Sequence, residues 1–132
     1  MASILVVTDE PFERIAYQAI LSPPHWLAIA SNSAEALAIL RSELAIDFLV
    51  CDHRLAAGDM DGIDLIRQAS EIRPNLFSLL TTSETPRKLQ PQLDALAGQG
   101  VKAEYYNKNQ GVKGVRVIVE YMAEYLPEYH KI

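Results

Sequence analysis

The feature that most constrains the fold is a series of short, nearly continuous apolar runs spaced along the chain. The runs are Ser3–Val7, Trp26–Ala30, Phe48–Cys51, Leu76–Leu80 and Val101–Tyr106. A strand that is buried on both faces gives an unbroken apolar run, whereas a half-exposed strand alternates apolar and polar residues. The runs therefore predict five strands of a buried parallel sheet.

Segments with helical spacing of apolar residues separate these runs. They are predicted from Pro11 to Ser22, from a cap at Asn32 through Leu44, over Gly62–Ile72, from about Pro91 to Gly98, and from about Gly111 to Leu126. Thr85–Pro86 could start the fourth helix, but its well-formed part is expected to begin only near Pro91, because proline is unfavourable inside a helix. Strands that alternate with helices predict one doubly wound α/β domain over residues 1–132, with helices on both faces of the sheet.

Composition excludes several classes of protein. With 132 residues and 49% hydrophobic residues, the chain can bury a single core and is not expected to be disordered. Its apolar runs are far shorter than a membrane-spanning helix needs, and no leader peptide is visible. The single cysteine, Cys51, cannot form an intramolecular disulfide. We expect a cytoplasmic protein.

The charge balance argues against nucleic acid as a ligand. Asp and Glu number 17 against 12 Lys and Arg, which gives a net charge of -5. A phosphate backbone is attracted by a basic surface, so we expect no direct nucleic-acid binding, and a cation is the better ligand. The chain also lacks the GxxxxGK[ST] phosphate loop and the GxSxG elbow that mark two common classes of α/β enzyme.

Polar residues follow the predicted strands at the point where each strand ends. They are Asp9, Asp52, Thr81, Thr82 and Lys108. Ligand sites in open parallel sheets lie beyond the carboxyl ends of the strands, so these side chains are expected to gather there. Two carboxylates can hold Mg²⁺, and a lysine beside them can neutralise phosphoryl oxygens while a carboxylate attacks phosphorus.

Five stretches resemble the receiver domain of two-component response regulators. They are ILVVTDEP at 4–11, DFLVCDHRL at 47–55, MDGIDLI at 60–66, PNLFSLLTTS at 74–83 and AEYYNKN at 103–109. The resemblance covers essentially the whole chain. It implies a flavodoxin-like sheet with strand order 2-1-3-4-5 and a signalling domain that is phosphorylated on an aspartate, not a turnover enzyme.

The resemblance also implies a role for each matching residue. Asp52 would be the phosphoryl acceptor, and Mg²⁺ would be held by Asp9, Asp52 and the backbone carbonyl of Arg54. Lys108 would pair with the phosphoryl oxygens. The residues implied to switch are the hydroxyl of Thr82, preferred to Thr81 because it stands eight residues after Pro74, and the ring of Tyr105.

Three residues depart from the pattern of the family. Thr8 stands where an acid usually precedes Asp9, Ala56 replaces a proline, and Asn109 replaces the proline that follows the lysine. We expect weaker Mg²⁺ binding, a longer and more mobile loop after Asp52, and a trans Lys108–Asn109 bond, because a cis bond before a residue other than proline costs about 2.5–4 kcal/mol.

Two classes of function follow. The first is a phosphorylated switch in a phosphorelay, with a sensor histidine kinase or phosphotransfer protein as donor and an effector protein or domain as target. The second is an interaction module that kept the fold but does not depend on phosphorylation, as Thr8, Ala56 and Asn109 favour. A small flavodoxin-like enzyme has less support, since fold alone does not imply function.

The last predicted helix carries a second apolar stripe. Val117, Tyr121 and Tyr125 lie roughly 120° from the face that would pack on the sheet. Exposed tyrosines are also compatible with an ordinary surface. We nevertheless hypothesise that this stripe is a surface for a partner or for self-association. A homodimer would form through the fourth helix, the fifth strand and the fifth helix.

Overall fold

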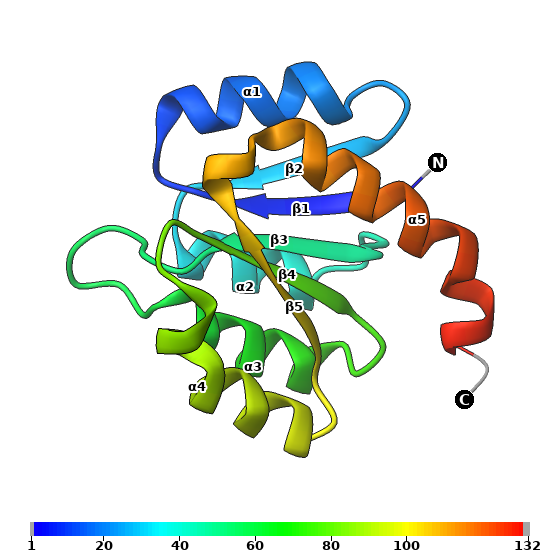
Figure 1. Cartoon of the computed structure of the whole chain (residues 1–132). Coiled ribbons are helices and arrows are strands. Elements are labelled where there is room, and N and C mark those ends of the chain that lie inside the picture. The colour runs from blue at the N-terminus through cyan, green and yellow to red at the C-terminus, as the bar shows by residue number, and fades with distance from the viewer. Residues whose placement is uncertain (1, 131–132) are drawn as a thin grey trace.

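A single parallel sheet of five strands forms the centre of the molecule in a computed structural model that describes residues 2–130, with side chains described up to residue 124 (Figure 1). The strands are β1 (Ser3–Val7), β2 (Trp26–Ala30), β3 (Phe48–Asp52), β4 (Phe77–Thr82) and β5 (Lys102–Asn107). Their order is β2-β1-β3-β4-β5, and each neighbouring pair is parallel. The predicted fold class and strand order are confirmed.

Five α-helices cover the two faces of this sheet. They are α1 (Pro11–Leu21), α2 (Ser33–Arg41), α3 (Gly62–Ile72), α4 (Pro86–Gly98) and α5 (Val112–His130), with a short 3-10 turn at Lys108–Gln110. Figure 1 shows α1 and α5 on one face and α2, α3 and α4 on the other. Among the described residues, no helix has both the length and the apolar character to cross a membrane.

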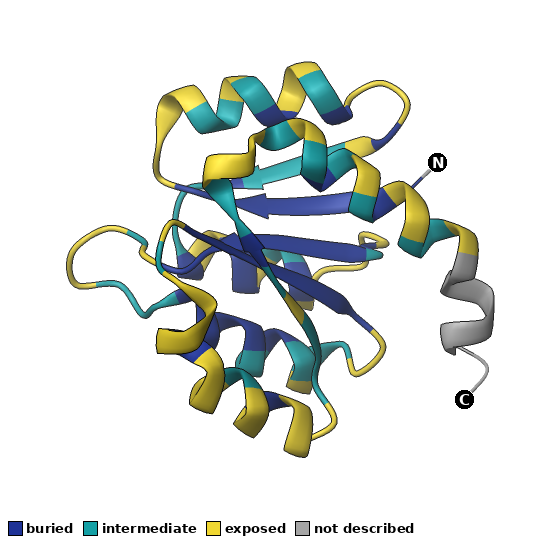
Figure 2. Cartoon of the chain, viewed as in Figure 1, coloured by how far each residue is buried: buried dark blue, intermediate teal, exposed yellow. Residues whose placement is uncertain are grey.

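Each face of the sheet has its own hydrophobic core. Successive side chains of a strand point to opposite faces, so Leu5 and Val7 pack with α2 and α3 while Ile4 and Val6 pack with α1 and α5. Figure 2 shows the strands β1, β3 and β4 buried and the outer faces of the helices exposed. This two-sided burial explains why the strands are continuous apolar runs in the sequence.

Helix α2 is shorter than the sequence predicted. It ends at Arg41 instead of Leu44, because Ser42 closes it with its N–H and its hydroxyl on the carbonyl of Ile39. The guanidinium of Arg73 then binds the carbonyls of Leu40 and Ser42 at 2.9 and 3.0 Å. The Ser42 hydroxyl and the Arg73 guanidinium thus bind carbonyls that would otherwise accept the N–H groups of a further helical turn. The prediction of a helix through Leu44 was wrong.

Helix α4 begins earlier than predicted and contains a proline in its interior. It starts at Pro86, a favourable first position, and continues through Pro91. Arg87 and Pro91 are both exposed, so water can satisfy the carbonyl that the Pro91 nitrogen cannot bond. Of the two starts considered, the one at Thr85–Pro86 is correct and the preferred one near Pro91 was wrong, because the helix is exposed at Pro91.

Strands β3 and β4 reach one or two residues further than the apolar runs indicated. β3 includes Asp52, and β4 runs from Phe77 through Thr82, with Asp52 opposite Thr81 in the register. Polar residues at strand ends can still join the hydrogen-bonded ladder, although they break the apolar pattern. The extension places the Asp52 and Thr81 side chains on the same side of the sheet.

Candidate functional site

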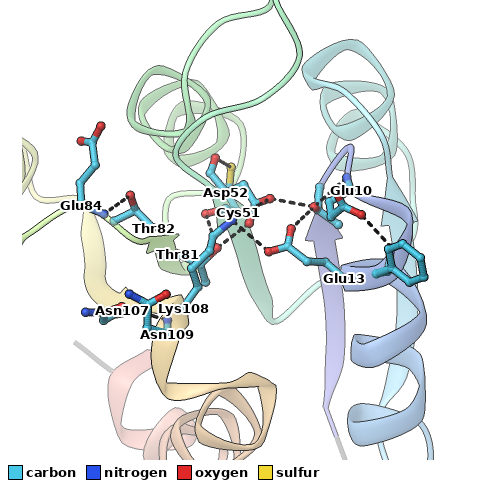
Figure 3. A network of polar contacts seen from close by, with 12 residues as sticks. Glu10, Glu13, Cys51, Asp52, Thr81, Thr82, Glu84, Asn107, Lys108 and Asn109 are labelled. Carbon is cyan, nitrogen blue, oxygen red and sulfur yellow. Dashed lines mark hydrogen bonds and ion pairs between the residues drawn. The ribbon is translucent and has the colours of Figure 1, made fainter.

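Asp52 is a buried carboxylate at the carboxyl end of the central strand β3. The residue is 3% exposed, and both of its carboxylate oxygens have hydroxyl partners. Thr81 Oγ1 lies 2.7 Å from Asp52 Oδ1 (Figure 3). Thr8 Oγ1 lies 2.7 Å from Asp52 Oδ2. Thr8 directly follows β1 and Thr81 lies on β4, so residues on or next to three adjacent strands position this one carboxylate.

A second carboxylate, Glu13, reaches the site from the first turn of α1. Its Oε1 is 2.9 Å from Lys108 Nζ, and its Oε2 is 2.8 Å from Thr8 Oγ1. Lys108 Nζ is also 3.6 Å from Asp52 Oδ2. The site therefore brings together Asp52, Lys108 and Glu13, of which the sequence analysis had named the first two.

Glu13 was missed because the sequence analysis considered only residues that directly follow strands. A signal was nevertheless present. Pro11 marks the first turn of a helix that starts just after β1, and Glu13 is in that turn. Thr8 also stands where an acid was expected. This was a reason to look for an acidic residue in the helix that follows.

The carboxylates of Asp52 and Glu13 compete for the one proton that the Thr8 hydroxyl can donate. Thr8 Oγ1 is within hydrogen-bond distance of both Asp52 and Glu13, but a hydroxyl donates one proton at a time. Burial raises the pKa of Asp52 to about 6, and the neighbouring Glu13 adds to that rise while the hydroxyls oppose it. Asp52 is thus partly protonated near pH 6, and the carboxylates need not both be ionised there.

The opposite shifts occur in the partners of Asp52. Burial works against ionised Glu13, but hydrogen bonds from Asp52 and Lys108 outweigh it and lower the pKa of Glu13. Burial also disfavours the charged ammonium of Lys108, yet the two carboxylates outweigh it and raise the pKa of Lys108. Around neutral pH, Glu13 and Lys108 form an ion pair of full charges.

The two threonines at the end of β4 point to different surroundings. Thr81 donates to Asp52, whereas the hydroxyl of Thr82 accepts the N–H of Glu84 at 3.1 Å. Thr82 also lines a small cavity of about 160 Å³ beside Lys108 and Arg54. Of these two threonines, Thr81 is the one bonded to Asp52, and movement of Thr82 toward a phosphoryl group remains a prediction.

Glu84, in the loop after β4, links the remaining residues that the sequence analysis singled out. The Tyr105 hydroxyl donates to the Glu84 carbonyl at 2.6 Å. The Arg54 Nε donates to Glu84 Oε1 at 2.9 Å. Tyr105 therefore points toward the loop between β4 and α4, while the guanidinium of Arg54 is held across the cavity that Thr82 lines. The switch role of Tyr105 and the ligand role of the Arg54 carbonyl stay predictions.

The acidic residues present do not fit a Mg²⁺ ion as they are arranged. Asp9 is exposed, and within the described part of the chain no three acidic, histidine or cysteine side chains gather closely enough to hold a metal. Both oxygens of Asp52 are bonded to hydroxyls, and Lys108 supplies a positive charge at the same place. A metal would therefore require these side chains to rearrange.

Comparison with solved structures identifies the fold. The signal receiver domain of an HD-domain-containing protein from Pseudomonas fluorescens superposes with a TM-score of 0.81 at 21% identity, over 98% of this chain and 92% of that chain. A CheY-like response regulator receiver domain protein from Methanospirillum hungatei superposes with a TM-score of 0.77 at 23% identity, over 99% and 98%. The chain has the receiver-domain fold.

Sequence comparison gives a more limited result for this receiver-fold chain. No protein-family model matches it. The cyclic di-GMP phosphodiesterase RocR of Pseudomonas aeruginosa is 33% identical over 84 residues, which are 62% of this chain and 21% of that protein. The chain thus spans about a fifth of the length of this curated relative. Asp52, Thr8, Thr81 and Lys108 lie at the edge of the sheet where sites in such folds are found.

Proposed function

We propose that the chain is a receiver-type signalling domain whose Asp52 accepts a phosphoryl group. One observation carries the proposal: a buried carboxylate ends the central strand with the ammonium of Lys108 3.6 Å away. A carboxylate can act as a nucleophile toward phosphorus, and a fixed ammonium stabilises the charge on the phosphoryl oxygens.

The donor in this proposal is the phosphohistidine of a sensor kinase or of a phosphotransfer protein. An oxygen of Asp52 attacks phosphorus, and the bond between phosphorus and the imidazole nitrogen breaks. The electron pair of that bond stays on the imidazole, and the phosphoryl group ends on Asp52 as an acyl phosphate. Lys108 then pairs with the new phosphoryl oxygens, and Thr82, on the wall of the adjoining cavity, is the hydroxyl positioned to approach them.

The proposed output is a change in the surface around α4, β5 and α5. Glu84 contacts both Arg54 and Tyr105, so a movement of Thr82 would reach Tyr105 through the loop that these residues share. An effector protein or domain would bind the altered surface. In this proposal the chain is a signalling domain in the cytoplasm and not a turnover enzyme.

Mg²⁺ belongs to the proposal only as an expectation from the resemblance. Asp9, Asp52 and the carbonyl of Arg54 would hold it, and it would neutralise phosphoryl oxygens when bound. Since the described side chains are not arranged for a metal, Lys108 is the group proposed to neutralise the phosphoryl oxygens.

A second candidate function is an interaction module that does not depend on phosphorylation. The specific observation in its favour is that Lys108 is already paired with Glu13 and that both oxygens of Asp52 are already bonded. A site whose polar groups already contact one another does not need a phosphoryl group to complete it.

Phosphorylation by a small donor with and without Mg²⁺ distinguishes the two functions. We expect acetyl phosphate and Mg²⁺ to add one phosphoryl group, and we expect Lys108→Gln to slow the addition at least tenfold, because the variant loses the positive charge that faces the phosphoryl oxygens. Intact mass measured over time reports the adduct. A correctly folded protein that forms no adduct at any Mg²⁺ concentration would contradict the proposed phosphoryl acceptor and favour the interaction module.

A further inference from the structure

The proposed acceptor is covered by an ion pair. The side chain of Asp52 is 3% exposed, whereas those of Glu13 and Lys108 are 22% and 33% exposed. Glu13 extends from α1 and Lys108 from the end of β5, and they meet beside Asp52 (Figure 3). This gradient of exposure places the Glu13–Lys108 pair on the solvent side of the carboxylate.

Within this group, Lys108 is closer to Glu13 than to Asp52. The nitrogen–oxygen distances are 2.9 Å to Glu13 and 3.6 Å to Asp52. The shorter distance is that of a charge-assisted hydrogen bond, and the longer one is an ion pair without good hydrogen-bond geometry. The contact with Glu13 therefore holds the ammonium in its present position.

Glu13 opposes an incoming phosphoryl group in two ways. It occupies the ammonium that phosphoryl oxygens would otherwise contact. It also brings a negative charge beside a group that is itself negative, and like charges that are close together in a partly buried site repel strongly.

We infer that Glu13 is a positioning residue that keeps the acceptor site closed by holding Lys108. The inference rests on the proposed function and adds a residue to it. Phosphorylation would require Lys108 to exchange the Glu13 carboxylate for phosphoryl oxygens. Thr8 supports the closed arrangement, because its hydroxyl lies within hydrogen-bond distance of both carboxylates, whereas an acid at this position would repel them.

The test compares Glu13→Gln with the matched control Glu10→Gln. Both substitutions remove one negative charge at the start of α1, but the Glu10 carboxylate accepts the N–H of Phe12, whereas the Glu13 carboxylate binds Lys108. We expect Glu13→Gln to lower the acetyl phosphate concentration that gives half the maximal rate by about tenfold, since the removed repulsion is that of two nearby charges. Glu10→Gln should change it little, and Glu13→Asp, which keeps the charge, should stay close to the unmodified protein.

A second readout does not depend on phosphoryl transfer. Inorganic phosphate, titrated into the folded protein and followed by calorimetry, should bind Glu13→Gln about tenfold more tightly than the unmodified chain. Adding Lys108→Gln to that variant should abolish the gain. If Glu13 served folding alone, Glu13→Gln would change the stability of the protein. It would not tighten phosphate binding in a way that depends on Lys108.

The outcomes separate the inference from the proposed function. If Asp52 is phosphorylated and Glu13→Gln behaves as Glu10→Gln in both assays, the inference is wrong and the function stands. If no variant forms an adduct, the proposed function fails, and the phosphate titration still decides whether Glu13 holds Lys108 away from anions.

Discussion

Asp52 is held in an environment that disfavours its ionised form. It is buried beside a second carboxylate, and burial is the largest cause of its raised pKa. Two hydroxyls and an ammonium offset only part of that cost. A buried carboxylate that raises the free energy of the folded protein is unusual for a structural residue, and it is typical of functional sites.

We predict that Asp52→Asn stabilises the folded protein and that the gain grows with pH. The pKa of Asp52 is about 6 in the folded chain against 3.8 ordinarily, so the folded state binds more protons between these values. Stability from this group is therefore present at low pH and is lost as pH rises through about 6. Urea denaturation should show a gain of roughly 1–3 kcal/mol at pH 7.5 and a smaller one at pH 4. Equal gains at both pH values would contradict this origin.

Among the site residues, Asp52 and Lys108 could be predicted from the sequence, because they are polar residues just after apolar runs. Glu13 could not be predicted in this way, because its position beside Asp52 depends on the direction that α1 takes after β1. The partner of Asp52 on β4 also depends on the register, in which Asp52 faces Thr81. Register and helix entry are tertiary features that local patterns do not specify.

At the scale of elements, the long loop between β3 and α3 is tethered to α2. The carboxylate of Asp59 accepts the N–H of Ser33 at 2.9 Å and also bonds its hydroxyl, so it lies at the amino end of α2. It accepts the N–H of Met60 at 2.8 Å as well. We expected a mobile loop from its length and from Ala56, and this tether restrains it at Asp59.

We predict that Asp59→Ala releases the loop without disturbing the sheet. The substitution removes an interaction with a helix amino end, which is worth about 1 kcal/mol. Amide hydrogen exchange should become faster in residues 55–61 and in the first turn of α2. Asp61→Ala is the matched control, because Asp61 caps α3 at Asp64 and its loss should affect α3 instead. Unchanged exchange in α2 after Asp59→Ala would show that the tether is not formed in solution.

At the scale of the whole molecule, alternation of apolar runs and helices was enough to predict the sheet and its two helical layers. The errors lie at Leu44 and Pro91, where side-chain capping and solvent exposure decide where a helix ends or begins. The outer surface is less predictable. Val117 is 68% and Tyr121 60% exposed, as the second stripe on α5 predicted, while the side chain of Tyr125 lies outside the described residues.

The hypothesised homodimer through α4, β5 and α5 can be tested by a substitution on α5 that would weaken self-association. If Val117 lies in the interface, Val117→Glu should weaken self-association by at least tenfold, because a buried charge without a partner is costly. Sedimentation over a range of protein concentrations measures this. Glu120→Gln, a change on the same helix, serves as the control. An unmodified chain that sediments as a monomer at every concentration would exclude the homodimer.

Intact mass measurement tests directly whether Asp52 accepts a phosphoryl group. The unmodified protein and Asp52→Asn are incubated with acetyl phosphate and Mg²⁺, and their intact masses are compared. We expect one phosphoryl group on the unmodified protein and none on the variant, which lacks the nucleophilic carboxylate. An adduct on both proteins, or on neither while both are folded, would contradict this role of Asp52.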